Sequence, residues 1–188
     1  MSDTLTATRP TVNGINLEAL TQTVEAIQQD PNLAMVGFRV KTAWAGQTRS
    51  ESTVKSYTLG GVDHARNFTI VADEPEELLG ANSAPNPQEL LMSAVNACMM
   101  VGYVANAALR GITLDECVIE TEGELDLRGF LGLDDSVPPG YRRIDYRVRM
   151  KGDGTRAQYA EIHEAVMKTS PNYFNMSRPI AMNGVLVD

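Results

Sequence analysis

The chain has 188 residues, of which 43% are hydrophobic and 21% are charged, as is ordinary for a soluble globular protein. Its formal net charge of −8, with no stretch that concentrates Lys and Arg, argues against nucleic acid as a partner. The first residues lack the apolar core of a signal peptide, and no run approaches the ~18 apolar residues of a membrane span. Two cysteines without a secretory signal predict free thiols in a reducing cytoplasm.

The N-terminal half predicts an arm, a helix and three strands. Residues 1–13 are polar and interrupted by proline, which is typical of a flexible arm. Asn16 can cap an amphipathic helix that continues to about residue 30. Apolar and polar residues then alternate, and this pattern predicts strands near residues 34–44, 49–59 and 67–72. We expect residues 14–188 to form a single domain that opens with the helix at 14–31.

One long helix is predicted from residue 85 to residue 110. Asn86 is a favourable N-cap, and Glu89 at the third helical position forms a near-relative of the capping box with it. Gly111 supplies the stop. Apolar and small residues recur at helical spacing and place Cys98 on the apolar face. A helix this long and this apolar is expected at the centre of the fold.

The C-terminal half predicts two more strands, a helix and a terminal strand. Thr155 and Gln158 form a capping box that opens the helix, and Ser170-Pro171 ends it. The apolar residues of a Gly/Pro-broken insertion at 128–140 need cover from their own subunit or from a partner. The strands are expected near residues 114–127, 142–151 and 180–187. Because the strand pairs lack βαβ crossovers, the fold class is α+β with antiparallel sheets.

Few residues offer catalytic chemistry. His64 and His163 are the only histidines, and neither lies near a cysteine or a second ligand, so we expect no metal site. No glycine-rich motif stands in the context of a phosphate or dinucleotide site, so we expect no cofactor. Thiol chemistry remains, although a mid-helix cysteine such as Cys98 is by default a buried core residue. Cys117, which alternates inward on a strand, fits that default better still.

A family resemblance changes the interpretation of Cys98. Asn86-Pro87-Gln88-Glu89-Leu90-Leu91, followed by a small-residue helix that leads to Asn96-Ala97-Cys98, resembles the signature of the OsmC/organic hydroperoxide resistance (Ohr) family. Supporting matches cover residues 14–188 and indicate an OsmC-like branch; they include Trp44-Ala45-Gly46, Ala108–Ile112, Glu124–Leu133, Pro139-Gly140-Tyr141 and Ser170-Pro171. The resemblance implies antiparallel sheets wrapped around two long central helices in an intertwined homodimer, with a site at each interface.

The resemblance also implies a mechanism and its residues. In the family a cysteine thiolate attacks the O–O bond of an organic hydroperoxide. An arginine activates the cysteine, and a carboxylate holds the arginine in place. Cys98 occupies the attacking position, and Arg49 is the best match to the arginine. Gln88 stands at the carboxylate position, so Glu89, its neighbour, is the candidate carboxylate, although it also has a role as helix cap.

The chain departs from the family at the resolving cysteine, where it has Ser170. Serine cannot form a disulfide, so we predict that Cys98 forms none within the chain and that an external thiol recycles it. The first functional hypothesis is therefore a thiol peroxidase in which Cys98, Arg49 and Glu89 act without a cofactor. The alternative is a non-catalytic dimer that binds a small apolar ligand at the Cys98 pocket.

Overall fold

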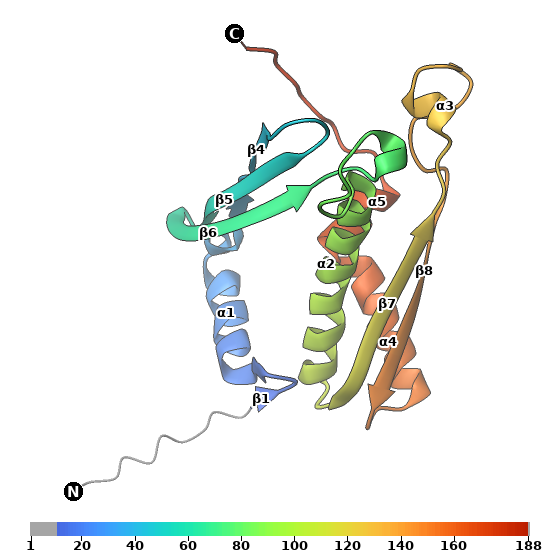
Figure 1. Cartoon of the computed structure of the whole chain (residues 1–188). Helices are drawn as coiled ribbons and strands as arrows, with labels where there is room; N and C mark the ends of the chain where they lie inside the picture. Colours follow the sequence, from blue (N-terminus) through green and yellow to red (C-terminus); the bar gives the residue numbers. More distant parts are fainter. Residues whose placement is uncertain (1–10, 188) are drawn as a thin grey trace, which may run out of the picture. The chain divides into compact units, whose positions relative to one another are not determined.

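The structure is a computed structural model that describes residues 11–187 (Figure 1). The chain divides into two compact units, Met1–Leu91 and Met92–Asp188, which are described one at a time. Most of the predicted arm, residues 1–10, lies outside the described residues. The end of the arm differs from the prediction, because strand β1 (Thr11–Val12) pairs with β2 (Ile15–Asn16) in a short hairpin.

The predicted first helix is confirmed as α1 (Leu17–Gln29), and the Asn16 side chain caps it by accepting a hydrogen bond from the Ala19 backbone N–H. A short 3₁₀ turn, η1 (Pro31–Ala34), follows it. Here the backbone turns toward the first strand of the sheet.

The first unit contains a four-stranded antiparallel sheet with β5 (Ser50–Leu59) at its centre. Strands β3 (Val36–Phe38) and β4 (Lys41–Trp44) pair in succession with β5, and β6 (Val62–Ala72) also pairs with it. The single strand predicted over 34–44 is thus two strands, and the strand predicted at 67–72 begins earlier. A further 3₁₀ turn, η2 (Glu76–Leu78), lies in the loop after β6.

The predicted long helix is confirmed as α2 (Pro87–Leu109), which begins at the end of the first unit and continues into the second. Gly111 follows it with a φ of 69°, the left-handed conformation expected of the stop residue. By length and composition α2 could cross a membrane, a property that core helices of soluble proteins share. Its fully buried side chains are Met99, Tyr103, Ala107 and Ala108.

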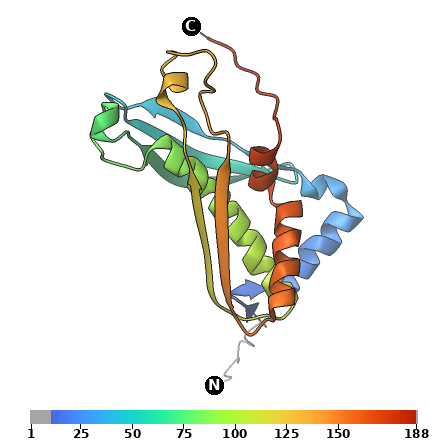
Figure 2. The same ribbon diagram turned by 90° about the vertical axis from the view of Figure 1, so that its right-hand side faces the viewer.

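The second unit pairs a hairpin with helices. Strands β7 (Leu114–Gly123) and β8 (Ile144–Gly152) are antiparallel, and they run alongside α2 and α4 (Arg156–Thr169) in Figures 1 and 2. The Thr155–Gln158 capping box that opens α4 is confirmed. Two short helices complete the unit: α3 (Leu127–Phe130), between the strands, and α5 (Pro171–Ser177), directly after α4.

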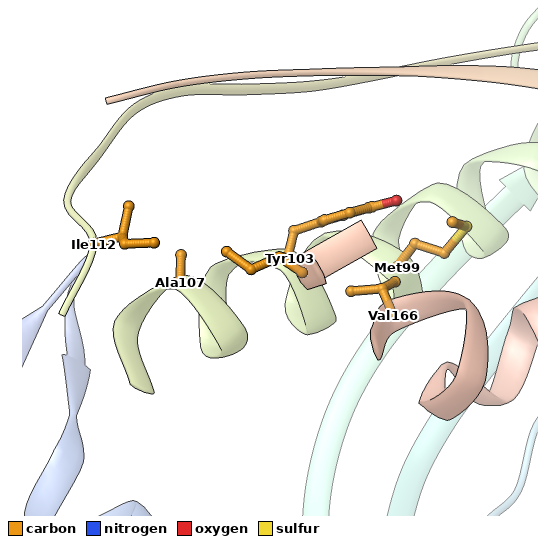
Figure 3. Close-up of a cluster of buried hydrophobic side chains, with 6 residues drawn as sticks. Met99, Tyr103, Ala107, Ile112 and Val166 are labelled. Atoms are coloured by element: carbon orange, nitrogen blue, oxygen red, sulfur yellow. The ribbon is translucent and has the colours of Figure 1, made fainter. Parts of the chain in front are cut away.

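The core of the second unit lies between α2, α4 and the hairpin. Figure 3 shows Met99, Tyr103 and Ala107 on one face of α2, with Val166 of α4 beside them. The helices approach closely at Gly102, where an added Cβ would lie only 3.1 Å from Val166 Cγ2. The small residues of α2 therefore allow close helix packing.

Two segments of this unit keep apolar side chains exposed. The insertion forms α3, with Phe130, Leu131 and Leu133 mostly exposed. The terminal strand predicted at 180–187 is wrong for the single chain: this segment has no strand structure, and its Leu186 side chain is 98% exposed. A strand forms only where a neighbouring edge offers backbone partners, and the described part of this chain does not pair with the segment.

Candidate functional site

Cys98 lies on α2 and is partly exposed, and its sulfur contacts a buried hydroxyl group. The Ser170 hydroxyl donates a hydrogen bond to Cys98 Sγ over 3.5 Å, within the range for a sulfur acceptor. Ser170 is only 5% exposed. The residue at the resolving position therefore faces the candidate thiol as a hydrogen-bond donor.

The end of α4 fixes Ser170 in this position. Its backbone N–H donates to the Val166 carbonyl at 2.8 Å as α4 ends, and its hydroxyl accepts from the Tyr173 backbone N–H as α5 begins. Pro171 favours this break because it cannot continue the helix ladder of α4 yet fits the first turn of a new helix. From α5, the Asn172 side-chain amide donates to the Ala94 carbonyl on α2 at 2.9 Å. The junction of α4 and α5 is thus tied to α2 one turn before Cys98.

Cys117 has different surroundings. It lies on β7 opposite Met150 of β8 and packs against the core, as the alternation predicted. Burial raises the pKa of the Cys117 thiol because the thiolate would lose its hydration. Both cysteines are free thiols. Cys117 therefore lies in an apolar setting that suppresses thiolate chemistry.

Arg49 lies in the first unit, where the turn after β4 leads into β5. The turn is closed by the Arg49 backbone N–H, which donates to the Gly46 carbonyl, and by the Trp44 indole N–H, which donates to the Gln47 carbonyl. The guanidinium donates to Ser83 Oγ through Nη1 and to Glu51 Oε1 through Nη2, each at 3.0 Å. Arg49 and Cys98 belong to different units, so their predicted cooperation stays a prediction.

Glu89 has the structural role that the sequence indicated. Its carboxylate accepts from the Asn86 backbone N–H at 2.8 Å, and its own N–H donates to the Asn86 side chain at 2.8 Å. This reciprocal capping box is confirmed, whereas a catalytic role for Glu89 stays a prediction. Among the described residues, the carboxylate that contacts Arg49 is Glu51. The Arg-x-Glu spacing at the start of a strand, which puts both side chains on one face, could have identified it.

Sequence reasoning also missed a buried carboxylate behind Ser83. Asp73, at the end of β6, is 1% exposed and accepts a hydrogen bond from the Ser83 hydroxyl at 2.7 Å. It also accepts from the Thr48 hydroxyl at 2.8 Å and from three backbone N–H groups, those of Glu74, Ala81 and Ser83. These donors, with the Ser83 hydroxyl first, hold the pKa of Asp73 well below its usual range. No local sequence motif marked this residue.

The histidines contribute structure. Nδ1 of His163 shares a 2.6 Å hydrogen bond with the buried Tyr103 hydroxyl, and the two rings stack. His64 stacks on Tyr57 in the first unit. Among residues 11–187, no group of three or more His, Cys, Asp or Glu side chains could hold a metal ion.

The fold is similar to that of solved OsmC-like proteins. At TM-score 0.57, an OsmC-like protein from Mycoplasma pneumoniae is 15% identical, with 74% of this chain and 86% of that chain covered. An OsmC-like protein of unknown function from Vibrio cholerae has TM-score 0.55 and 12% identity, with 74% and 93% covered. An OsmC-like hydroperoxide resistance protein from Jannaschia has TM-score 0.45 and 15% identity, with 81% of this chain and 93% of that chain covered.

The solved structures at these identities show the fold alone. No curated protein matches the chain. A family model described as OsmC-like protein matches residues 80–183, which is more than half of the sequence. The matched segment contains all of α2, the β7–β8 hairpin and the Cys98–Ser170 contact. The chain therefore belongs to the OsmC-like protein family.

Proposed function

We propose that the chain is a thiol-dependent peroxidase that reduces organic hydroperoxides through Cys98, without a resolving cysteine of its own. The Cys98 thiolate attacks the terminal peroxide oxygen, so that an S–O bond forms and the O–O bond breaks. The organic alcohol leaves after taking up a proton, and Cys98 becomes a sulfenic acid. An external thiol then displaces water to form a mixed disulfide, and a second thiol reduces this disulfide and restores Cys98.

The observation that carries the proposal is the hydrogen bond from Ser170 to Cys98 Sγ. A hydroxyl donor stabilises a thiolate more than a neutral thiol, because hydrogen bonds to charged acceptors are the stronger ones. The same hydroxyl can bond to the sulfenate oxygen after the first step. In this scheme Arg49 activates the thiolate and holds the peroxide. Glu89 remains a candidate for the carboxylate on the strength of the family resemblance alone. Its hydrogen bonds in the structure are those of a helix cap.

A peroxide titration with site-by-site mass spectrometry tests this function. We expect one equivalent of cumene hydroperoxide to convert Cys98 to a sulfenic acid that dimedone traps, while Cys117 stays reduced. The intact chain should show no loss of two hydrogens, and dithiothreitol or a lipoyl thiol should support turnover. If Cys98 does not react, the alternative function, a dimer that binds a small apolar ligand, is favoured instead.

The proposed active form is a homodimer in the cytoplasm. Two features support a second copy: Val101 on α2 is 69% exposed, and the apolar tail at 180–187 is unpaired. A second copy would cover the first and would offer a sheet edge to the second. The free thiols Cys98 and Cys117 fit a reducing compartment. Light scattering after size exclusion should give twice the chain's 20.5 kDa; a stable monomer at micromolar concentration would contradict the dimer.

A further inference from the structure

The loop that follows β6 is built around one buried charge. Asp73 accepts five hydrogen bonds, two from hydroxyl groups and three from backbone N–H groups. Both of its oxygens are used: Thr48 and the Glu74 N–H bind Oδ1, whereas Ser83 and the Ala81 N–H bind Oδ2. A buried carboxylate requires such compensation, because a charge that is removed from water without partners is strongly unfavourable.

One of these donors also contacts Arg49. Because the Ser83 hydroxyl proton points to Asp73 Oδ2, the lone pairs of Ser83 Oγ remain to accept the hydrogen bond from Arg49 Nη1. The two bonds form a chain from guanidinium through hydroxyl to carboxylate. In such a chain each hydrogen bond polarises the next and strengthens it. The Thr48 hydroxyl binds the same carboxylate through Oδ1 and is not part of this chain of bonds.

We infer that Asp73, acting through Ser83, is the positioning residue for the Arg49 guanidinium, in the role that the family assigns to a carboxylate at the Gln88 position. The inference rests on the proposed function for the role of Arg49. Arg49 Nη2 donates to Glu51 Oε1, and Nη1 donates to Ser83 Oγ. These two bonds hold both ends of the guanidinium and so define the side-chain conformation. Glu51 binds directly on the strand, whereas Asp73 binds through a hydroxyl.

Ser83→Ala and Thr48→Val form a matched pair that tests the positioning. Each variant removes one hydroxyl donor to Asp73, but only Ser83→Ala breaks the link to Arg49. The probe is phenylglyoxal, which modifies free guanidinium groups, with the modification of Arg49 and of the exposed Arg39 followed by mass spectrometry. We expect Ser83→Ala to raise the modification rate of Arg49 by about tenfold relative to Arg39, as loss of a hydrogen bond to a charged group allows.

Thr48→Val should leave the Arg49 modification rate within about twofold of wild type. Ser83→Thr, which keeps the hydroxyl, should restore the wild-type rate. Equal acceleration in Ser83→Ala and Thr48→Val would overturn the inference, since Asp73 would then only stabilise the loop. No acceleration in Ser83→Ala would overturn it as well.

A second measurement separates this inference from the proposed function. In a peroxidase, Ser83→Ala should also lower the rate constant for oxidation of Cys98 by cumene hydroperoxide by about tenfold, with Thr48→Val near wild type. If wild type shows no peroxide reactivity while the phenylglyoxal pattern holds, the proposed function fails. The positioning of Arg49 by Asp73 and Ser83 would then still stand.

Discussion

Cys98 on α2 and Cys117 on β7 have different surroundings. Both thiols lie in the second unit, and both are free and partly exposed. Cys117 packs against core side chains, and burial raises its pKa, whereas Cys98 accepts a hydrogen bond from the buried Ser170 hydroxyl. The hydroxyl that distinguishes the two settings comes from a helix junction 72 residues away in the sequence.

The largest expected effect separates the two thiols by substitution. Cys98→Ser should lower the rate of cumene hydroperoxide reduction with dithiothreitol by about 10³-fold or more, because the attacking sulfur is absent. Cys117→Ala should retain the rate, since the core thiol does not take part. Steady-state peroxide consumption measures both, with circular dichroism as a check on folding. Unchanged activity in Cys98→Ser would remove the functional distinction between the thiols.

Ser170→Cys is expected to convert the contact into a disulfide. The Oγ–Sγ distance of 3.5 Å places the two side chains close enough that a small shift would allow an S–S bond. After one equivalent of peroxide, intact-mass measurement should show the loss of two hydrogens in this variant. The double variant with Cys98→Ser should not show it. A disulfide in wild type, between Cys98 and Cys117, would contradict the comparison directly.

A smaller effect should follow from removal of the hydroxyl alone. Ser170→Ala is expected to lower the rate of Cys98 alkylation by iodoacetamide at pH 7 by about tenfold, because the thiolate loses a charge-assisted hydrogen bond. Ser177→Ala is the matched control, since that hydroxyl on α5 donates to the Phe174 carbonyl instead. Equal rates in all three proteins would show that Ser170 does not influence the thiol.

The smallest effect concerns Cys117 and pH. Burial raises its pKa, so the unfolded chain loses this proton first as the pH rises through the ordinary cysteine range near ~8.5. The free energy of unfolding should therefore fall from that pH until the folded thiol also titrates. Urea unfolding between pH 7 and pH 10 should show a steeper decline for wild type than for Cys117→Ala. Parallel curves would mean that Cys117 is not in an apolar environment.

Local signals predicted much of the fold. The caps at Asn16, Asn86 and Thr155 placed the starts of three helices, because each cap satisfies backbone N–H groups by short-range contacts. Alternation on β7 also placed Cys117 against the core correctly. Such features depend on residues within one or two turns, so the sequence pattern contains them.

The remaining errors arise from contacts that no local pattern encodes. The strand predicted over 34–44 is divided because β3 and β4 pair with different parts of β5. The tail at 180–187 is rich in apolar residues, yet its composition cannot show whether a sheet edge is within reach. The partners of Arg49 follow from the loop around Asp73, whose hydrogen bonds link residues up to 34 positions apart.

The close contact between Gly102 and Val166 has a consequence for Cys98. Gly102 lies one helical turn after Cys98 on α2, and Val166 lies one turn before Ser170 on α4. A Cβ at Gly102 would come 3.1 Å from Val166 Cγ2, so one added methyl group would require the Val166 side chain to shift by a few tenths of an ångström. The absence of a side chain at Gly102 thus helps to set the distance between the Ser170 hydroxyl and the Cys98 sulfur. Gly102→Ala should therefore slow Cys98 alkylation although Cys98 and Ser170 are both unchanged.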